Sequence, residues 1–404
     1  MIYNSKRIIS KYQNHKLMDN NYILSRKTKL VFLSISVIGI LLIALSFLFE
    51  HPESKQVWMN ILLNNLFFLF LSLFGALFIA LHKIAHSGWH TSLTRIPEAL
   101  SKFLPYAAVL MFLLIFGMHD LYHWTHHDLH DPIIEGKSAY LNQAFFFIRM
   151  AIYFAGWIGL SYLLRRNSVN QDLSDNPKYH KQSKILAALF MAFFAVSSST
   201  MSWDWIMSVD PHWFSTLFGW YVFIGLFVSG IAAFILIIAF LKSQGYIEFV
   251  NKEHVHDLGK YLFGFSIFWM YLWYFQYMLI WYSHMPEETI YYAQRINGFP
   301  IIFYALLFLN FLFPFLGLMT RNSKRNIKWL AMVAFVVLVG QWLNIYFMLS
   351  PGIIGESATV GFIEVGSACL YLGGFLFVVF NALTKKPLLC KNDPFLKESF
   401  HYET

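Results

Sequence analysis

The sequence predicts an all-α integral membrane protein that crosses the bilayer ten times, with both termini in the cytoplasm. Charged residues make up 13% of the 404 residues and hydrophobic residues 57%. A soluble domain has about 25% charged residues, so this chain has too little polar surface to cover a globule of its size. Ten apolar runs and an alternation of basic loops support the same fold class.

Each apolar run is long enough to cross a bilayer as a helix, which takes about 17 to 25 residues. A helix satisfies its backbone amides internally, as lipid requires, and no run shows the alternation of a membrane β-strand. The predicted helices 1 to 10 are Leu30–Phe49, Val57–Leu81, Phe103–Leu121, Asn142–Leu164, Ile185–Met207, Thr216–Leu241, Tyr261–Tyr282, Ile301–Met319, Trp329–Met348 and Val360–Phe380.

Basic residues set the predicted orientation, because cytoplasmic loops are rich in Lys and Arg. The N-terminal arm, the C-terminal tail and the loops after even-numbered helices hold nearly all of them, whereas the loops after odd-numbered helices hold only Lys55, Lys137 and Arg295. We therefore expect a cytoplasmic arm (1–29), a membrane domain (30–381) and a cytoplasmic tail (382–404). Because the net charge of +8 lies in loops and not on one face, we expect no nucleic-acid partner.

Helices 3 and 7 end in similar sequences. Both Gly117–Trp124 and Ile280–Glu287 combine aromatic residues with His. Helix 7 comes four helices after helix 3, so a repeat of two four-helix units in parallel orientation is one interpretation.

Polar side chains at membrane depth concentrate in the outer halves of the predicted helices. Such residues are costly in lipid and are candidates for function or for pairs that tie helices together. Arg149 always carries its charge and needs a partner, for which Asp204, Asp120 and Glu364 are candidates. We expect a polar cavity open to the outer side, in which Arg149, Asp204, His119 and Asp120 meet, to serve helix packing, proton transfer or a polar head group. The full candidate set is His119, Asp120, Arg149, Asp204, Gln276, Gln341, Asn344 and Glu364.

Histidines cluster after helix 3. The spacing of the HxxxH and HxxHH patterns is similar to that of membrane di-iron desaturases, but His82, His86 and His90 are predicted on the opposite side of the bilayer. An interfacial cluster that binds a partner or relays protons is the favoured interpretation. Cys369 and Cys390 are too few to ligate an iron–sulfur cluster, and we expect no metal. The cluster comprises His123, His126, His127 and His130.

Two stretches carry a family resemblance. Trp203–Phe214, continuing to Tyr221, resembles the signature between helices 5 and 6 of the ActF subunit of bacterial alternative complex III, and Gly88–Glu98 resembles another part of it. More distantly, the ten-helix core is similar to NrfD/PsrC-like membrane subunits. The resemblance implies two four-helix bundles flanked by helices 1 and 10.

The resemblance also implies a function. It implies a subunit of a respiratory quinol:electron-acceptor oxidoreductase in the bacterial inner membrane. This subunit would carry no metal or haem. Its ligand would be menaquinol, and its role would be proton transfer. The implied partners are lipid, a paralogous quinol-binding membrane subunit, an iron–sulfur subunit, c-haem subunits and a terminal oxidase. The alternatives are a stand-alone histidine-box di-iron oxidase or desaturase, and a purely structural scaffold.

Overall fold

The computed structural model describes residues 21–126, 131–174, 176–355 and 359–403, and this part of the chain is helical without a strand. The all-α prediction is therefore confirmed. The main helices are α3 (Arg26–Phe49), α4 (Ser54–Ile84), α5 (Arg95–Leu100), α6 (Leu104–Phe112), α7 (Met118–Leu121), α8 (Pro132–Lys137), α9 (Gln143–Leu173), α10 (Pro177–Trp205), α11 (Phe218–Ser243), α12 (Lys252–Ser283), α13 (Pro286–Gly298), α14 (Pro300–Leu307), α15 (Phe313–Gly317), α16 (Arg321–Arg325), α17 (Ile327–Ile353), α18 (Phe362–Leu383) and α19 (Leu396–Phe400).

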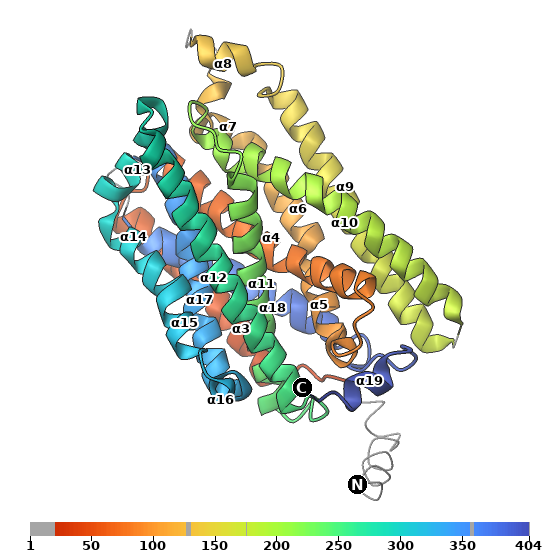
Figure 1. The fold of residues 1–404 in the computed structure, drawn as a ribbon. Helices are drawn as coiled ribbons and strands as arrows, with labels where there is room; N and C mark the ends of the chain where they lie inside the picture. Colours follow the sequence, from red (N-terminus) through yellow and green to blue (C-terminus); the bar gives the residue numbers. More distant parts are fainter. Residues whose placement is uncertain (1–20, 127–130, 175, 356–358, 404) are drawn as a thin grey trace, which may run out of the picture.

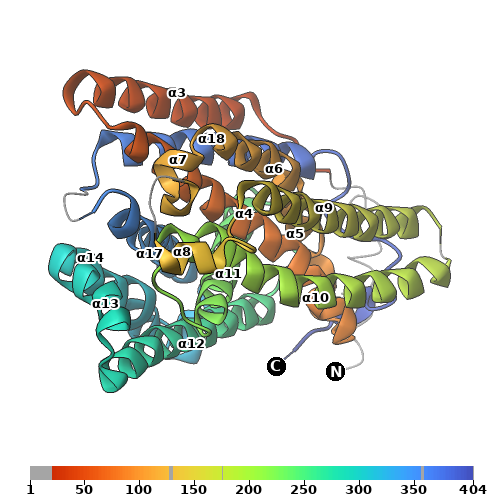
Figure 2. The same ribbon diagram turned by 90° about the horizontal axis from the view of Figure 1, so that it is seen from above.

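The long helices pack in two groups (Figures 1 and 2). The first group is α4, α6, α9 and α10, and the second is α11, α12, α14 with α15, and α17. Helices α4 and α11 join the two groups, and α3 and α18 pair along the edge beside α4. In the most apolar stretch of α4, 94% of the residues are buried, compared with 17% in that of α3. Helix α4 therefore lies at the centre and α3 faces outward.

Glycines allow α3 and α18 to approach closely. A Cβ added at Gly39 would lie 2.5 Å from the backbone nitrogen of Leu370, and one at Gly373 would lie 2.7 Å from the carbonyl oxygen of Phe32. Small residues at such positions let membrane helices pack backbone to backbone. These glycines therefore form a seam that holds α3 against α18.

The described chain contains nine helical segments that are long and apolar enough to cross a membrane, which makes it a multi-pass membrane protein. The predicted crossing Tyr261–Tyr282 is the one not among them. It belongs to α12, which packs beside α11, but eight of its side chains are Tyr or Trp, which are only partly apolar. The count of ten crossings and their orientation stay predictions.

Two predicted helices are interrupted, which corrects their single-helix assignment. The segment Phe103–Leu121 breaks into α6, a 3-10 turn at Leu113–Phe116 and α7. The break falls at Gly117, where an added Cβ would lie 2.1 Å from the ring of Trp58.

The segment Ile301–Met319 contains a π-helical turn, Phe308–Leu312, between α14 and α15. Proline lacks an amide hydrogen, and its ring crowds the carbonyl group four residues earlier. For Pro314 that residue is Asn310, which lies within the wider turn. The π turn thus relieves the clash that a regular helix would have at this point.

The residues after α18 pack against the loop ends of both groups. Lys83 and Asp393 form an ion pair of 2.6 Å. The buried Ser399 Oγ donates to the carbonyl oxygen of Trp89 at 2.7 Å. The segment expected only as a tail therefore covers this end of the molecule.

Candidate functional site

Arg149 on α9 and Asp204 on α10 form a bidentate ion pair. Arg149 Nε donates to Asp204 Oδ2 at 2.9 Å, and an Arg149 Nη donates to Oδ1 at 2.8 Å. Tyr153, one turn further along α9, donates its hydroxyl to Oδ2 at 2.8 Å. Of the three carboxylates considered as partners of Arg149, the structure selects Asp204.

The pair is buried and stacked on aromatic rings. Asp204 is 0% exposed and Arg149 is 7% exposed. The guanidinium carbon lies 3.9 Å from the ring centroid of Tyr140 and 4.2 Å from that of Phe145, and the other Nη of Arg149 donates to the Tyr140 carbonyl oxygen at 3.0 Å. The cation–π contacts and the three hydrogen bonds of Arg149 offset part of the cost of burying this charge.

A cavity of about 530 Å³, here called the Trp203 pocket, adjoins the pair. Tyr140, whose ring contacts Arg149, lines it. Ser208 lines it from the turn after α10, and its hydroxyl donates to the Asp204 carbonyl oxygen at 2.5 Å. Burial, and then the charge of Asp204, raise the pKa of Tyr140, so its hydroxyl stays protonated. The rest of the wall is largely apolar and includes Trp203, Met207, Trp213 and Phe214.

The turn between α10 and α11 links the pocket to both helix groups. Trp213 stacks on Tyr291 of α13 with ring centroids 3.7 Å apart, and Tyr122 donates to the Trp205 carbonyl oxygen at 3.1 Å. His212 contacts Asp131, which caps α8, at 2.6 Å. The Trp-rich turn therefore contacts α13 and the residue that caps α8.

Glu364 has partners of its own on α4. Its carboxylate accepts from Gln56 at 2.8 Å, from Asn60 at 3.0 Å and from the backbone nitrogen of Gly361 at 2.8 Å. The chain continues through Ser367 to Asn64. This polar chain joins α18 to α4 and does not reach Arg149 through any contact among the described residues.

Asn344 and Gln341 lie inside the second group. Tyr221 of α11 donates to Asn344 of α17, and Gln341 is 1% exposed with its amide nitrogen unpartnered among the described residues. Gln276 is buried on α12. These three amides thus belong to a different helix group from the Arg149–Asp204 pair.

His119 and Asp120 also lie apart from the pair. His119 is exposed and contacts Thr125 at 3.1 Å, and Asp120 accepts from Ser54 at 2.6 Å. Direct contacts join Arg149 to Asp204, whereas His119 and Asp120 have other partners. The expected cavity shared by all four residues stays a prediction.

The histidine cluster is only partly described. His123 and His126 are exposed, with ring centroids 6.4 Å apart, whereas His127 and His130 lie outside the described residues. Within the described ranges, no three His, Cys, Asp or Glu side chains are grouped closely enough to hold a metal ion.

The other resembling stretch forms an ion-pair cluster at the opposite end. Arg95 pairs with Glu98 at 2.6 Å and with Asp172 of α9. Asp172 also accepts from the backbone nitrogen of Lys391 at 2.9 Å. This cluster ties α5 and α9 to the segment after α18.

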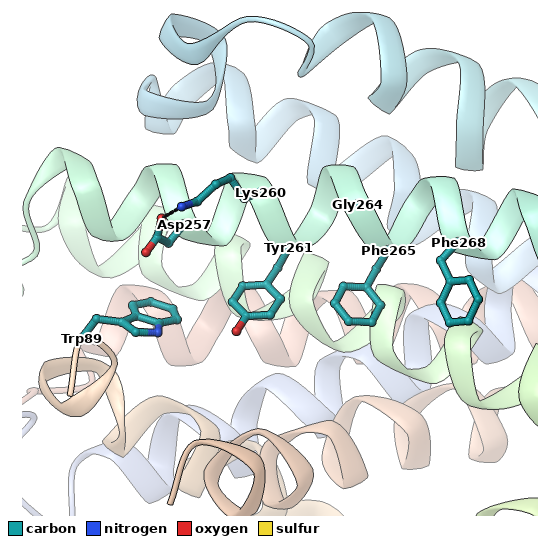
Figure 3. Close-up of a pocket in the computed structure, with 7 residues that line it drawn as sticks. All are labelled: Trp89, Asp257, Lys260, Tyr261, Gly264, Phe265 and Phe268. Carbon is teal, nitrogen blue, oxygen red and sulfur yellow. Dashed lines mark ion pairs between the residues drawn. The ribbon is translucent and has the colours of Figure 1, made fainter. Parts of the chain in front are cut away.

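A second cavity, of about 470 Å³, lies along α12 at this end (Figure 3). Sequence reasoning missed it, because its residues come from α12 and from a loop more than 160 positions earlier. We call it the α12 groove, lined by Trp89, Asp257, Lys260, Tyr261, Gly264, Phe265 and Phe268.

Comparison of the chain with models of known protein families finds no matching family, and comparison with curated proteins finds no matching relative.

Proposed function

We propose that this protein is a membrane subunit of a respiratory complex that oxidises quinol, with the Trp203 pocket as its site for proton transfer and for the quinol head group. The observation that carries the proposal is the buried Arg149–Asp204 pair beside an aromatic-walled cavity. The stretch Trp203–Phe214, which builds much of that wall, is also the stretch with the most specific family resemblance.

The pair is suited to accept a proton. Quinol oxidation releases protons, which need an acceptor within hydrogen-bond reach. Asp204 is held by Arg149 and by the Tyr153 hydroxyl. If Tyr153 turns away, Asp204 Oδ2 keeps the bond from Arg149 Nε and can accept one further hydrogen bond in place of the Tyr153 hydroxyl. Tyr153 and Tyr140 were not among the sequence candidates, since a tyrosine in an aromatic-rich helix carries no distinct signal.

The pocket is suited to a flat head group. Its volume of about 530 Å³ lies within the roughly 300 to 1,000 Å³ typical of small-molecule sites. Trp203, Trp213 and Tyr140 contribute aromatic rings to its lining, and Ser208 and Lys137 contribute polar groups. Such a mixture of apolar walls and few polar groups is typical of quinone pockets.

The remaining parts of the proposal rest on the resemblance. The chain itself would carry no metal or haem, the ligand would be menaquinol, and electrons would pass through iron–sulfur and c-haem subunits. A paralogous membrane subunit would be its neighbour in the bacterial inner membrane, and a terminal oxidase would be a further partner. Two four-helix bundles, ten crossings and cytoplasmic termini belong to the same proposal.

The test is Asp204→Asn in the assembled complex. The matched control is Asp393→Asn, which also removes one charge from an ion pair, here partly buried and at the opposite end. We expect quinol oxidation coupled to proton release to fall about 100-fold for Asp204→Asn, the scale of a lost proton acceptor, and to persist for Asp393→Asn.

Two other outcomes would replace the proposal. Full activity in Asp204→Asn together with Glu364→Gln would establish a structural scaffold. Stoichiometric iron that disappears when His123, His126 and His127 are replaced would establish the di-iron oxidase.

A further inference from the structure

The α12 groove lies apart from the Trp203 pocket and has its own polarity. Asp257, Lys260 and Tyr261 lie at one end, and Phe265 and Phe268 at the other (Figure 3). Residues at this spacing share one helix face, and at 1.5 Å per residue the groove runs about 16 Å along α12. A membrane phospholipid has the same order, with a charged head group followed by apolar acyl chains.

The groove has room for an acyl chain. A Cβ added at Gly264 would meet no atom within 4 Å, so open space follows the helix at its middle. Phe268 is 37% exposed and the Lys260 side chain 50%. The groove is therefore open along its side, where a lipid can enter.

The charges at its polar end cancel. Lys260 Nζ lies 2.5 Å from Asp257 Oδ1, so the groove offers one positive and one negative group. Another cavity differs, since Lys242, Lys252 and Arg325 line it. Of these, Arg325 pairs with Glu253. An anionic head group suits that cavity, whereas the groove suits a head group that carries both signs.

Aromatic rings flank the carboxylate. The rings of Trp89 and Tyr261 are 24° from parallel with centroids 6.1 Å apart, and Tyr402 lies beside Trp89 and donates its hydroxyl to Asp257. Ring faces attract ammonium groups, and a carboxylate accepts their N–H bonds. Lys260, half-exposed, can turn from Asp257 to a phosphate.

We propose that the α12 groove binds one zwitterionic phospholipid of the ethanolamine class. Its phosphate contacts Lys260, its ammonium lies between Asp257 and the ring of Tyr261, and one acyl chain follows Gly264 to Phe268. The site is separate from the Trp203 pocket and does not depend on quinol oxidation.

The experiment uses the full chain purified in mild detergent, delipidated, and titrated with phosphatidylethanolamine, phosphatidylglycerol or menaquinone under native mass spectrometry. Gly264→Phe fills the groove. Gly374→Phe is the matched control, because a Cβ at Gly374 also meets nothing within 4 Å. Lys260→Gln removes the phosphate contact without touching the helix core.

We expect one tightly held phosphatidylethanolamine on the unaltered chain and on Gly374→Phe. Gly264→Phe should lose it, and Lys260→Gln should bind it about tenfold more weakly, a change worth one polar contact. Equal retention in Gly264→Phe and Gly374→Phe, tighter binding of phosphatidylglycerol, or selective loss of menaquinone from Gly264→Phe would each overturn the proposal. None of these results tests the function proposed for the Trp203 pocket.

Discussion

Arg149 and Asp204 face each other across α9 and α10 through two parallel hydrogen bonds of 2.9 and 2.8 Å, and neither side chain is more than 8% exposed. A buried pair of this kind is not a large source of stability, but breaking it leaves an uncompensated charge. The resulting loss of stability can be measured separately from any effect on activity.

Arg149→Met is expected to destabilise the protein by about 3 to 5 kcal/mol, because it removes one partner of a buried ion pair and leaves Asp204 buried without the other. Adding Asp204→Leu should restore much of that loss, since the double variant has no buried charge left. Denaturant titration of each variant in mild detergent gives both free energies of unfolding. A double variant that is less stable than Arg149→Met would show that the pair itself is a main source of stability.

The α3–α18 seam predicts opposite outcomes for adjacent glycines. Gly373→Leu should destabilise the protein by about 1 to 3 kcal/mol through overpacking, because its Cβ would lie within 3 Å of α3 backbone atoms. Gly374→Leu should be tolerated, because a Cβ there meets nothing within 4 Å. Thermal unfolding of the two variants provides the comparison, and equal stabilities would contradict the close seam.

The contact between the C-terminal segment and His254 should weaken as the pH falls. His254 Nε2 contacts Ser92 and Ser399 at 3.3 and 3.2 Å, and its Nδ1 contacts Asn251 at 2.6 Å. Burial lowers the pKa of His254 to about 4, whereas the unfolded value is about 6.5. Between these values the unfolded chain binds the extra proton.

Stability from His254 is therefore fully present above about pH 6.5 and is lost toward pH 4, by up to about 1.4 kcal/mol per pH unit. Release of the C-terminal residues by carboxypeptidase should be faster at pH 5 than at pH 7. In His254→Gln that difference should shrink, because glutamine does not titrate. An unchanged pH dependence in this variant would assign the effect to another group.

The crossing of α12 can be tested by cysteine labelling. After replacement of Cys369 and Cys390, single cysteines are placed at the exposed Gln244, before α12, and at the exposed Glu287, after it. A membrane-impermeant maleimide applied to intact cells should label Glu287→Cys and leave Gln244→Cys unlabelled until the cells are opened. Labelling of both in intact cells would show that α12 does not cross.

Sequence patterns predicted the helices well, because apolar runs and basic loops are set by the contrast between lipid and water. They also placed Arg149 and Asp204 at similar depth. Depth alone does not fix how each helix is rotated, so the separation of Asp120 and Glu364 from Arg149 could not be foreseen.

The irregular parts were beyond the sequence patterns for a different reason. The π turn at Asn310 has a local cause in Pro314, although the type of turn does not follow from the proline alone. The break at Gly117 lies against the ring of Trp58, a contact between residues far apart in the sequence. The same holds for the segment after α18, whose polar composition indicated an exposed tail, although Ser399 is fully buried against the loop before α5.

The most direct test of the central claim is purification of the tagged full chain from its native membrane in mild detergent, followed by a pyridine haemochrome spectrum and an assay of menaquinol oxidation. We predict that c-type haem and iron–sulfur subunits co-purify with the chain and that the preparation oxidises menaquinol. A chain that purifies alone, with no c-type haem and no menaquinol oxidation, would contradict the account.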